Sequence, residues 1–145
     1  MIGRAIAMQP SGFVESSGTT CNGVDRMNST TCNVDAGYDH TYRIFLRSGE
    51  KITISETSGP CFLGSSHARL KVYQSPTACG DPAVGSCVDS SKLVSCVTGT
   101  KQVIAAAEGW HVIVVDGDTP SDGIEYSLTV KLDPASCVGV GCECP

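Results

Sequence analysis

The chain lacks the sequence features that mark membrane spans and nucleic-acid-binding proteins. None of its stretches approaches the roughly 18 consecutive apolar residues of a transmembrane helix. Its 10 Lys and Arg residues are scattered and are outnumbered by 15 Asp and Glu residues, which gives a net charge of −5. Because phosphate binding needs clustered basic side chains, we expect no nucleic-acid partner, no membrane span and no adsorption to anionic lipid.

The chain also has little of what nucleophilic catalysis requires. It contains 3 His residues and no Gly-x-Ser-x-Gly motif, whereas a serine or cysteine nucleophile needs a base within hydrogen-bonding reach. His67 follows two serines in an expected loop, where serine is ordinary turn material. His111 is expected on the solvent side of a strand or at a sheet edge. The sequence therefore predicts that the protein is not an enzyme.

Short runs of alternating apolar and polar residues take the place of helical periodicity, which is nearly absent. Alternation with a period of two is typical of half-buried β-strands. It predicts strands over residues 40–46, 51–55, 69–73, 101–106, 110–116 and 125–132, and two further strands near residues 12–16 and 93–97. Short strands at this spacing indicate an all-β fold, an antiparallel β-sandwich.

The alternation also predicts which side chains face the core and how the strands connect. Val112–Val115 is apolar on both faces, which predicts a central strand. Residues 47–50 are expected to form a turn, and residues 79–87 a loop. Strands 101–106 and 110–116 are expected to form a hairpin across Glu108 and Gly109. The side chains expected to face the core include Tyr42, Ile44, Leu46, Ile52, Ile54, Tyr126, Leu128, Val130 and Leu132.

Cysteine is the most informative residue that the chain has. Its abundance beside so few His residues indicates a disulfide framework, and hence a secreted protein of the extracellular space or cell surface. The odd count leaves one sulfur for a free thiol, an interchain bond or a ligand. The nine cysteines are Cys21, Cys32, Cys61, Cys79, Cys87, Cys96, Cys137, Cys142 and Cys144.

The spacing of the cysteines favours some pairs, although sequence alone does not fix connectivity. Cys21 and Cys32 are close enough for a local loop, as are Cys79 and Cys87, and Cys61 and Cys96 are a candidate third pair. The tail is expected to form a disulfide from Cys142 or Cys144 to Cys137 or to a core cysteine, and a zinc site is the alternative. Candidates for an interchain sulfur are Cys21, Cys142 and Cys144.

Three parts are expected along the chain. Residues 1–20 form an N-terminal extension, either a strand donor or a linker; residues 21–134 form the sandwich; residues 135–145 form a cysteine-rich tail. The first eight residues are too short an apolar region for a signal peptide, so we expect that any leader has been removed. Asn28 begins an Asn-Ser-Thr sequon and is a candidate glycosylation site.

The order of motifs over residues 37–132 resembles a known family. Asp39-x-x-Tyr42-x-x-x-Leu46 precedes a Gly-x-x-Ile-x-Ile strand at residues 49–54 and a Leu-x-Val-Tyr strand at residues 70–73. A Gly-Trp-x-Val-x-Val-Val-Asp-Gly strand at residues 109–117 and Gly-x-x-Tyr-x-Leu-x-Val at residues 123–130 follow. This order is similar to the bacterial pre-peptidase C-terminal domain family, in its disulfide-bearing secreted form. The resemblance implies a jelly-roll-like sandwich, an accessory role without catalytic residues, and, as in some relatives, binding to collagen or polysaccharide.

Two kinds of ligand site are candidates. The loop at residues 116–123 carries three carboxylates, Asp116, Asp118 and Asp122, which could hold calcium, although Asp-Gly pairs also make ordinary turns. We expect no cofactor other than this calcium. Aromatic side chains could form a sugar-stacking platform, with Trp110 as the candidate ligand contact, although packing in or across strands is their usual role. The other members would be Tyr38, Tyr42, Tyr73 and Tyr126.

Two functions from different classes follow. The first is a non-catalytic structural subunit that associates with copies of itself into a fibre or surface layer, by strand addition, by an interchain disulfide, or by both. The odd cysteine and the two ends that lie outside the sandwich favour it. The alternative is an accessory binding module of a secreted peptidase or surface protein, which recognises polysaccharide or a matrix protein.

Overall fold

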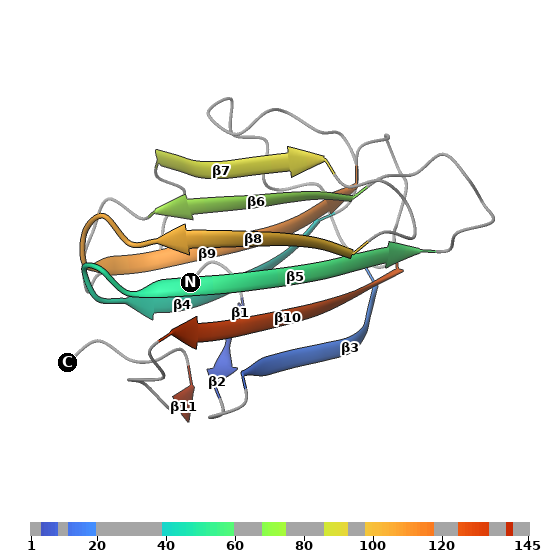
Figure 1. Cartoon of the computed structure of the whole chain (residues 1–145). Coiled ribbons are helices and arrows are strands. Elements are labelled where there is room, and N and C mark those ends of the chain that lie inside the picture. The colour runs from blue at the N-terminus through green and yellow to red at the C-terminus, as the bar shows by residue number, and fades with distance from the viewer. Residues whose placement is uncertain are drawn as a thin grey trace.

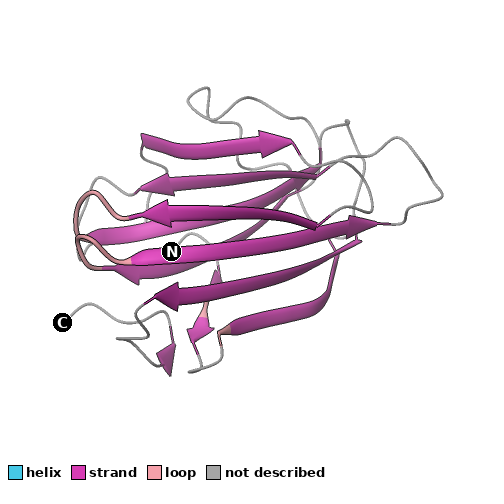
Figure 2. Ribbon diagram, viewed as in Figure 1, coloured by secondary structure: helices cyan, strands magenta, loops and turns pink. Residues whose placement is uncertain are grey.

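The computed structural model describes residues 4–8, 12–19, 39–59, 68–74, 86–92, 98–117, 125–133 and 139–140. These residues form strands and the turns between them (Figures 1 and 2). The described part contains no helix long and apolar enough to cross a membrane. The strands are β1 (Arg4–Ala5), β2 (Ala7–Met8), β3 (Phe13–Thr19), β4 (Asp39–Leu46), β5 (Lys51–Gly59), β6 (Ala68–Gln74), β7 (Ser86–Lys92), β8 (Thr98–Ile104), β9 (Gly109–Gly117), β10 (Glu125–Asp133) and β11 (Gly139–Val140).

The strands form two sheets that pack face to face as a sandwich. One sheet has the order β1-β4-β9-β6-β7, the other has the order β3-β10-β5-β8, and β2 pairs separately with β11. Neighbouring strands run antiparallel, except that β1 runs parallel to β4. The predicted all-β sandwich is confirmed.

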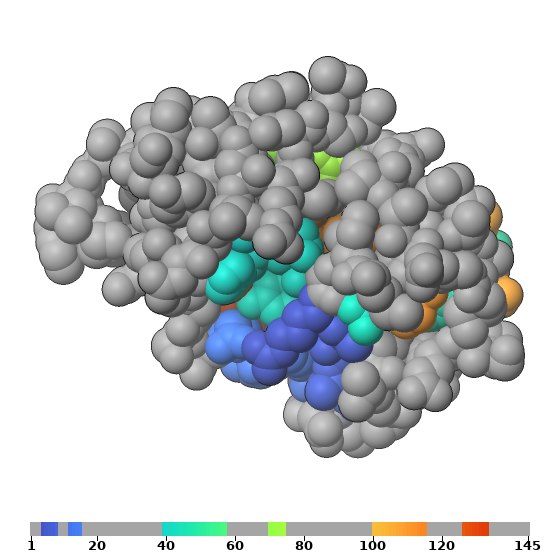
Figure 3. Space-filling model, turned by 180° about the vertical axis from the view of Figure 1, so that it is seen from behind, coloured from blue at the N-terminus to red at the C-terminus, as the bar shows by residue number. Residues whose placement is uncertain are grey.

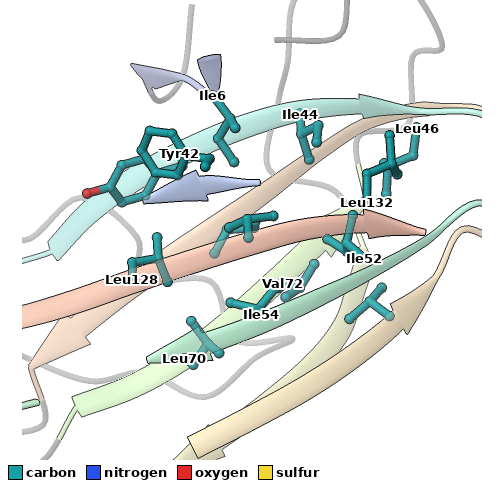
Figure 4. Close-up of a cluster of buried hydrophobic side chains, with 14 of the residues drawn as sticks. Ile6, Tyr42, Ile44, Leu46, Ile52, Ile54, Leu70, Val72, Leu128 and Leu132 are labelled. Carbon is teal, nitrogen blue, oxygen red and sulfur yellow. The ribbon is translucent and has the colours of Figure 1, made fainter. Parts of the chain in front are cut away.

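The core lies between the two sheets and is built from alternate residues of each strand. Tyr42, Ile44 and Leu46 of β4 face Ile52 and Ile54 of β5, all 3% exposed or less. Figure 4 shows these side chains pointing toward one another from both sheets. The predicted inward faces of these strands are therefore confirmed. The other core members are Ile6, Met8, Phe13, Leu70, Val72, Val103, Ala105, Ile113, Val115, Tyr126, Leu128, Val130 and Leu132.

The central position predicted for residues 112–115 is also confirmed. Strand β9 lies between β4 and β6, in the middle of the five-stranded sheet. Its odd-numbered residues Ile113 and Val115 join the core, while Val112 and Val114 are equally buried on the outer face. A strand buried on both faces reads as a continuous apolar run, because water reaches neither side of it.

Two short connections cross from one sheet to the other at the same end of the sandwich. Residues 47–50 join β4 to β5, and residues 105–108 join β8 to β9. The hairpin expected between residues 101–106 and 110–116 is therefore wrong, because β8 pairs with β5 and β9 pairs with β4 and β6. Sheets pack only about 10 Å apart, so a short connection can bridge two layers as readily as two neighbours.

The turn predicted at residues 47–50 is confirmed, and its bonds show why it is tight. Glu50 N donates to Arg47 O at 3.1 Å, and Arg47 N donates to a Glu50 carboxylate oxygen at 2.7 Å. Gly49 has φ +85°, a conformation that the third residue of a type II turn requires and that glycine adopts without steric cost.

Strands from the segment expected to lie outside the sandwich are part of it. β1 is an edge strand of the five-stranded sheet, and β3 is an edge strand of the four-stranded sheet. Ile6, Met8 and Phe13 are buried in the core. Removing these three side chains from water stabilises the fold by roughly 6 kcal/mol, before the entropy of ordering the segment is subtracted. Gly12, with φ +102°, lies so close to β10 that a Cβ there would sit 2.8 Å from Val130 O.

Two further strands differ from the prediction. β5 continues to Gly59, beyond the expected end at Ser55. β7, at residues 86–92, pairs with β6 where the sequence predicts the end of a loop. The strand expected near residues 93–97 lies outside the described residues.

Candidate functional site

The two ends of the sandwich are built differently. At the end opposite the 47–50 and 105–108 crossings, eight strand ends meet, and we name this the loop end. It is fixed by strand pairing, since Asp39 faces Asp116 and Ala68 faces Gly117 in one sheet, while Glu125 faces both Thr19 and Gly59 in the other. The connections that start and finish there are residues 20–38, 60–67, 93–97 and 118–124. The opposite end, with the 47–50 and 105–108 crossings, is named the turn end.

A hydrogen-bonded cluster of three side chains lies between the sheets on the side toward the loop end. His40 and Tyr42 lie two residues apart on β4 and so share its inner face, and Tyr126 faces them from β10. His40 Nδ1 and Tyr126 Oη are 2.8 Å apart, and the hydroxyls of Tyr42 and Tyr126 are 2.5 Å apart. The His40 and Tyr126 rings meet edge to face. We name these three residues the polar cluster.

Both tyrosines of the polar cluster stay protonated near neutral pH. Burial raises the pKa of Tyr42 above its usual value, although the hydrogen bond to Tyr126 opposes part of this shift. Burial also raises the pKa of Tyr126, and its bond to Tyr42 adds to the effect. Each phenol therefore has one proton to donate. When neutral His40 accepts at Nδ1, the chain of donation runs from Tyr42 to Tyr126 to His40.

An ion pair forms the exposed rim of the polar cluster. Arg4 Nη1 and Glu15 Oε2 are 2.9 Å apart, with 68% of the Arg4 side chain and 24% of the Glu15 side chain exposed. Phe13 packs against the Tyr42 ring, with 5.7 Å between ring centroids. Figure 3 shows atoms of residues 4–8 and 12–15, in blue, beside cyan atoms of β4 on this face. The polar cluster therefore joins a buried hydrogen-bond chain to a charged surface.

Glu56 is a buried acid on the inner face of β5, in the half of the strand nearer the loop end. Its strand partners are Leu128 on β10 and Gly99 on β8, and its side chain is fully buried. Neither carboxylate oxygen has a hydrogen-bond partner within the described part of the chain. Because burial penalises the charged form, the pKa of Glu56 rises to about 7.

The Trp110 ring lies on the outer face of the five-stranded sheet and is 8% exposed. It meets Phe45 edge to face, with 5.7 Å between centroids, and the Arg43 guanidinium carbon lies 5.8 Å from the Trp110 ring centroid. Tyr73 is also buried on this face, whereas Tyr42 and Tyr126 belong to the core. The ligand contact proposed for Trp110 stays a prediction, and Tyr38 lies outside the described residues.

His111 lies inside the sandwich, so the solvent-side or edge position expected for it is wrong. It is fully buried on central strand β9, where it shares the inner face with Ile113 and Val115. Its Nδ1 lies 3.1 Å from Gly109 O. Burial lowers the pKa of His111, which keeps the ring neutral, and the Gly109 carbonyl partly opposes this shift. His111 lies two and four positions before Ile113 and Val115, and this even spacing was the sequence signal that could have placed it on the inner face.

Most of the other predicted site residues lie outside the described part of the chain. This holds for Asn28, Asp118, Asp122 and every cysteine except Cys87, which pairs with Tyr73 in strand register. Asp116 lies in β9 near the loop end, where its strand partners are Asp39 on β4 and Arg69 on β6. Within the described residues, no three His, Cys, Asp or Glu side chains gather as metal ligands. The calcium site, the glycosylation site and the disulfide pairs stay predictions.

No protein-family model matches the chain, and no curated protein sequence matches it. Solved structures do share its fold. The periplasmic inhibitor of g-type lysozyme, PliG, from Aeromonas hydrophila is 18% identical, with 86% of this chain and 90% of that chain covered and a TM-score of 0.50. The surface-associated copper-binding protein CorA of Methylomicrobium album BG8 is 13% identical, with 81% and 93% covered and a TM-score of 0.52.

The pre-peptidase C-terminal domain of Bacillus anthracis collagenase gives a weaker likeness. It is 10% identical, with 83% of this chain and 89% of that chain covered, and the TM-score is 0.47. A TM-score below 0.5 does not establish family membership, so the family resemblance seen in the sequence stays a prediction. What the chain shares with PliG and CorA is the sandwich fold.

Proposed function

We propose that this chain is a non-catalytic binding module of an extracytoplasmic protein and that it holds a polysaccharide or a matrix protein at its loop end. The polar cluster carries the proposal. A buried chain of hydrogen bonds leads from Tyr42 and Tyr126 to the half-buried His40, beside the exposed Arg4–Glu15 pair. Such a set offers positioned donors and acceptors at the surface, which is what recognition of hydroxyl-rich or peptide ligands requires.

The chemistry of the polar cluster suits binding better than catalysis. The two phenols have raised pKa values, so they act as neutral hydrogen-bonding groups and not as bases. The partner of His40 Nδ1 is Tyr126, a weak acid that burial makes weaker still. Fixed hydrogen-bonding groups of this kind orient a ligand without reacting with it.

The architecture supports the same proposal. Binding residues are commonly placed on connecting segments held by a rigid scaffold, and four connections start and finish at the loop end. PliG is described as a lysozyme inhibitor of the periplasm, and CorA as a copper-binding protein of the cell surface. This support is an analogy at the level of the fold.

The proposal needs no cofactor, and calcium at Asp116, Asp118 and Asp122 remains a separate prediction. These carboxylates belong to the end of β9 and to the connection that follows it. Measuring the melting temperature during a calcium titration tests the prediction. No increase in melting temperature would remove calcium from the proposal and leave the polar cluster unaffected.

A binding panel tests the function. The full chain is passed over immobilised polysaccharides, with collagen and other matrix proteins beside them, and the affinity for each retained ligand is measured by calorimetry. We expect His40→Ala to weaken binding about tenfold, because a lost hydrogen bond costs about 1 kcal/mol or slightly more. Arg4→Ala is expected to act in the same direction.

The matched control lies at the turn end. Gln74→Ala removes an exposed hydrogen bond from Gln74 Nε2 to Ala107 O, measured at 3.2 Å, and should leave affinity unchanged. Binding that responds to Gln74→Ala and not to His40→Ala would move the site to the turn end. Retention on no ligand of either class would overturn the binding-module proposal.

A self-associating structural subunit is the second candidate. The observation that favours it is the N-terminal segment, which supplies one strand to each sheet of the sandwich. Strands of this kind can be supplied by a neighbouring copy as well as by the same chain. Light scattering across a concentration series, with free thiols alkylated and with them left free, separates non-covalent from disulfide-linked assembly.

A further inference from the structure

Residues 4–19 form a segment, here named the N-terminal clip, that bridges the two sheets along one edge of the sandwich. β1 lies beside β4, and β3 lies beside β10. In Figure 1 the blue strands β1 to β3 follow this edge, near β10. Figure 3 shows blue clip atoms at the surface. The clip therefore covers strand edges of β4 and β10 that would otherwise be open.

Backbone pairing and apolar contact hold the clip in place. β1 pairs with β4 at Arg4 and Ala5, and Ile6 N donates to Arg43 O at 3.0 Å. β3 pairs with β10 through five residue pairs, with a register shift between Tyr126 and Leu128. Ile6, Met8 and Phe13 fill the core with 0%, 1% and 7% of their surface exposed.

The ion pair of the clip joins two of its own residues. Arg4 and Glu15 bond each other at 2.9 Å, and both lie within residues 4–19. This ion pair therefore stays within the clip and does not have to break when the clip leaves β4 and β10. The contacts that tie the clip to β4 and β10 are of kinds that an identical chain can make equally well.

The connection that follows the clip is long enough for it to reach another copy. Residues 20–38 lie between β3 and β4. A fully extended connection of this length spans at most roughly 65 Å. Closing the expected Cys21–Cys32 loop would still leave roughly 35 Å.

We propose that two copies of this chain exchange their N-terminal clips, so that residues 4–19 of one copy pair with β4, β10 and β11 of the other. The inference deepens the second candidate function and rests on it. Because the exchanged contacts equal the original ones, concentration decides between the closed monomer and the exchanged dimer. If two copies exchange clips with each other, the assembly closes as a dimer. If each copy passes its clip to the next copy, the assembly extends into a fibre.

Edge strands β7 and β8 are not covered by the clip, and β8 gives a less suitable route to association than clip exchange does. β8 is the edge strand on the far side of the four-stranded sheet, and its Lys101 pairs with the inward-facing Ile54. An inward-pointing charge on an edge strand discourages pairing with another chain. Exchange of the clip needs no new edge-to-edge contact.

A peptide competition tests the proposal on the full chain. Residues 1–19 contain no cysteine, so a peptide of that sequence competes for the clip site without thiol exchange. The full chain, with disulfides intact and free thiols alkylated, is refolded from denaturant at increasing concentration and analysed by size exclusion with light scattering. We expect a dimer or larger species to form as concentration rises. Excess peptide should lower its fraction about tenfold by mass action.

The control peptide carries Ile6→Asp and Phe13→Asp, which place charges where the clip is buried. It should leave the assembled fraction unchanged. Equal dissociation by both peptides, or an assembly that neither peptide dissociates, would overturn clip exchange while self-association stands. A chain that stays monomeric at every concentration would overturn both.

Discussion

The turn end and the loop end of the sandwich satisfy their polar groups in different ways. At the turn end the two crossings bond to each other through the backbone, since Gly49 N donates to Ala105 O at 2.8 Å and Ala105 N donates to Glu50 O at 2.9 Å. Among the described residues toward the loop end, side chains supply a buried set of polar groups. Tyr126 bonds both His40 and Tyr42, and Glu56 has no described partner.

This difference bears on the proposed function, because it separates backbone groups paired at short turns from buried side chains with shifted pKa values. Paired backbone groups at short turns fix the position of four strands and carry no chemistry of their own. Buried side chains with raised pKa values are costly to maintain, and such groups cluster at functional sites. The proposed binding site at the loop end would then be held in position by the bonded crossings of the turn end.

Glu56 should give the largest measurable effect. Its pKa of about 7 in the folded chain lies above the ordinary value of 4.5. Between these values the folded chain keeps a proton that the unfolded chain has released. The free energy of unfolding should therefore fall by about 1.4 kcal/mol per pH unit as the pH rises through this window, roughly 3 kcal/mol in all, and then level off. Denaturant unfolding across the window measures it.

Glu56→Gln is the matched control, because it keeps the shape of the side chain and cannot ionise. It should remove the decline between pH 4.5 and pH 7 that Glu56 contributes. If the same decline remains in the variant, another group is responsible, and the difference between the two ends is smaller than the buried acid suggests.

Tyr126→Phe should give the next largest effect. The hydroxyl of Tyr126 contacts both His40 Nδ1 and Tyr42 Oη, so its removal leaves two polar atoms without that partner. We expect a loss of about 2 kcal/mol in the free energy of unfolding, because an unsatisfied buried group costs about 1 to 3 kcal/mol. Chemical denaturation at one pH measures it.

Tyr42→Phe should cost about half as much, because Tyr126 keeps its bond to His40. A double variant that loses no more than Tyr126→Phe alone would show that the two hydroxyls act as a unit. Equal losses in the two single variants would contradict the arrangement of the polar cluster.

Gly49→Ala tests the turn end and should cost about 1 kcal/mol. The positive φ of Gly49 disfavours any side chain, while nothing lies within 4 Å of the position of the new Cβ. The loss therefore comes from backbone conformation alone, and thermal unfolding measures it. Ser48→Ala in the same exposed turn is the control, with little or no expected loss. Unchanged stability in Gly49→Ala would mean that the turn relaxes at no cost.

The strands could be predicted from the sequence wherever apolar and polar residues alternate, because alternation reports directly which side meets the core. Strand β5 shows where this fails: the predicted strand ends at Ser55, whereas the structure continues to Gly59 and buries Glu56 at the next inward position. A buried acid breaks the pattern that identifies a strand.

Long-range pairing accounts for what the sequence could not predict. His40 and Tyr42 could be placed on one strand, but their contact with Tyr126 depends on how β4 and β10 face each other across the sandwich. The same is true of the crossing at residues 105–108, which resembles a hairpin turn in sequence. Local patterns define faces, whereas the choice of neighbour depends on the whole fold.

His111 should give the smallest effect, with the sign opposite to that of Glu56. Burial lowers its pKa below the ordinary 6.5, so the unfolded chain takes up a proton before the folded chain does as the pH falls. The free energy of unfolding should therefore fall below pH 6.5, by an amount that the Gly109 carbonyl reduces because it favours the protonated ring. Unfolding of His111→Leu beside the unsubstituted chain measures this contribution. His111→Leu should remove a loss of stability toward acid, whereas Glu56→Gln should remove a loss of stability toward neutral pH. If both results are found, each end of the core contributes its own pH dependence. Acid would then increase the stability contributed by Glu56 near the loop end and decrease the stability contributed by His111 near the turn end.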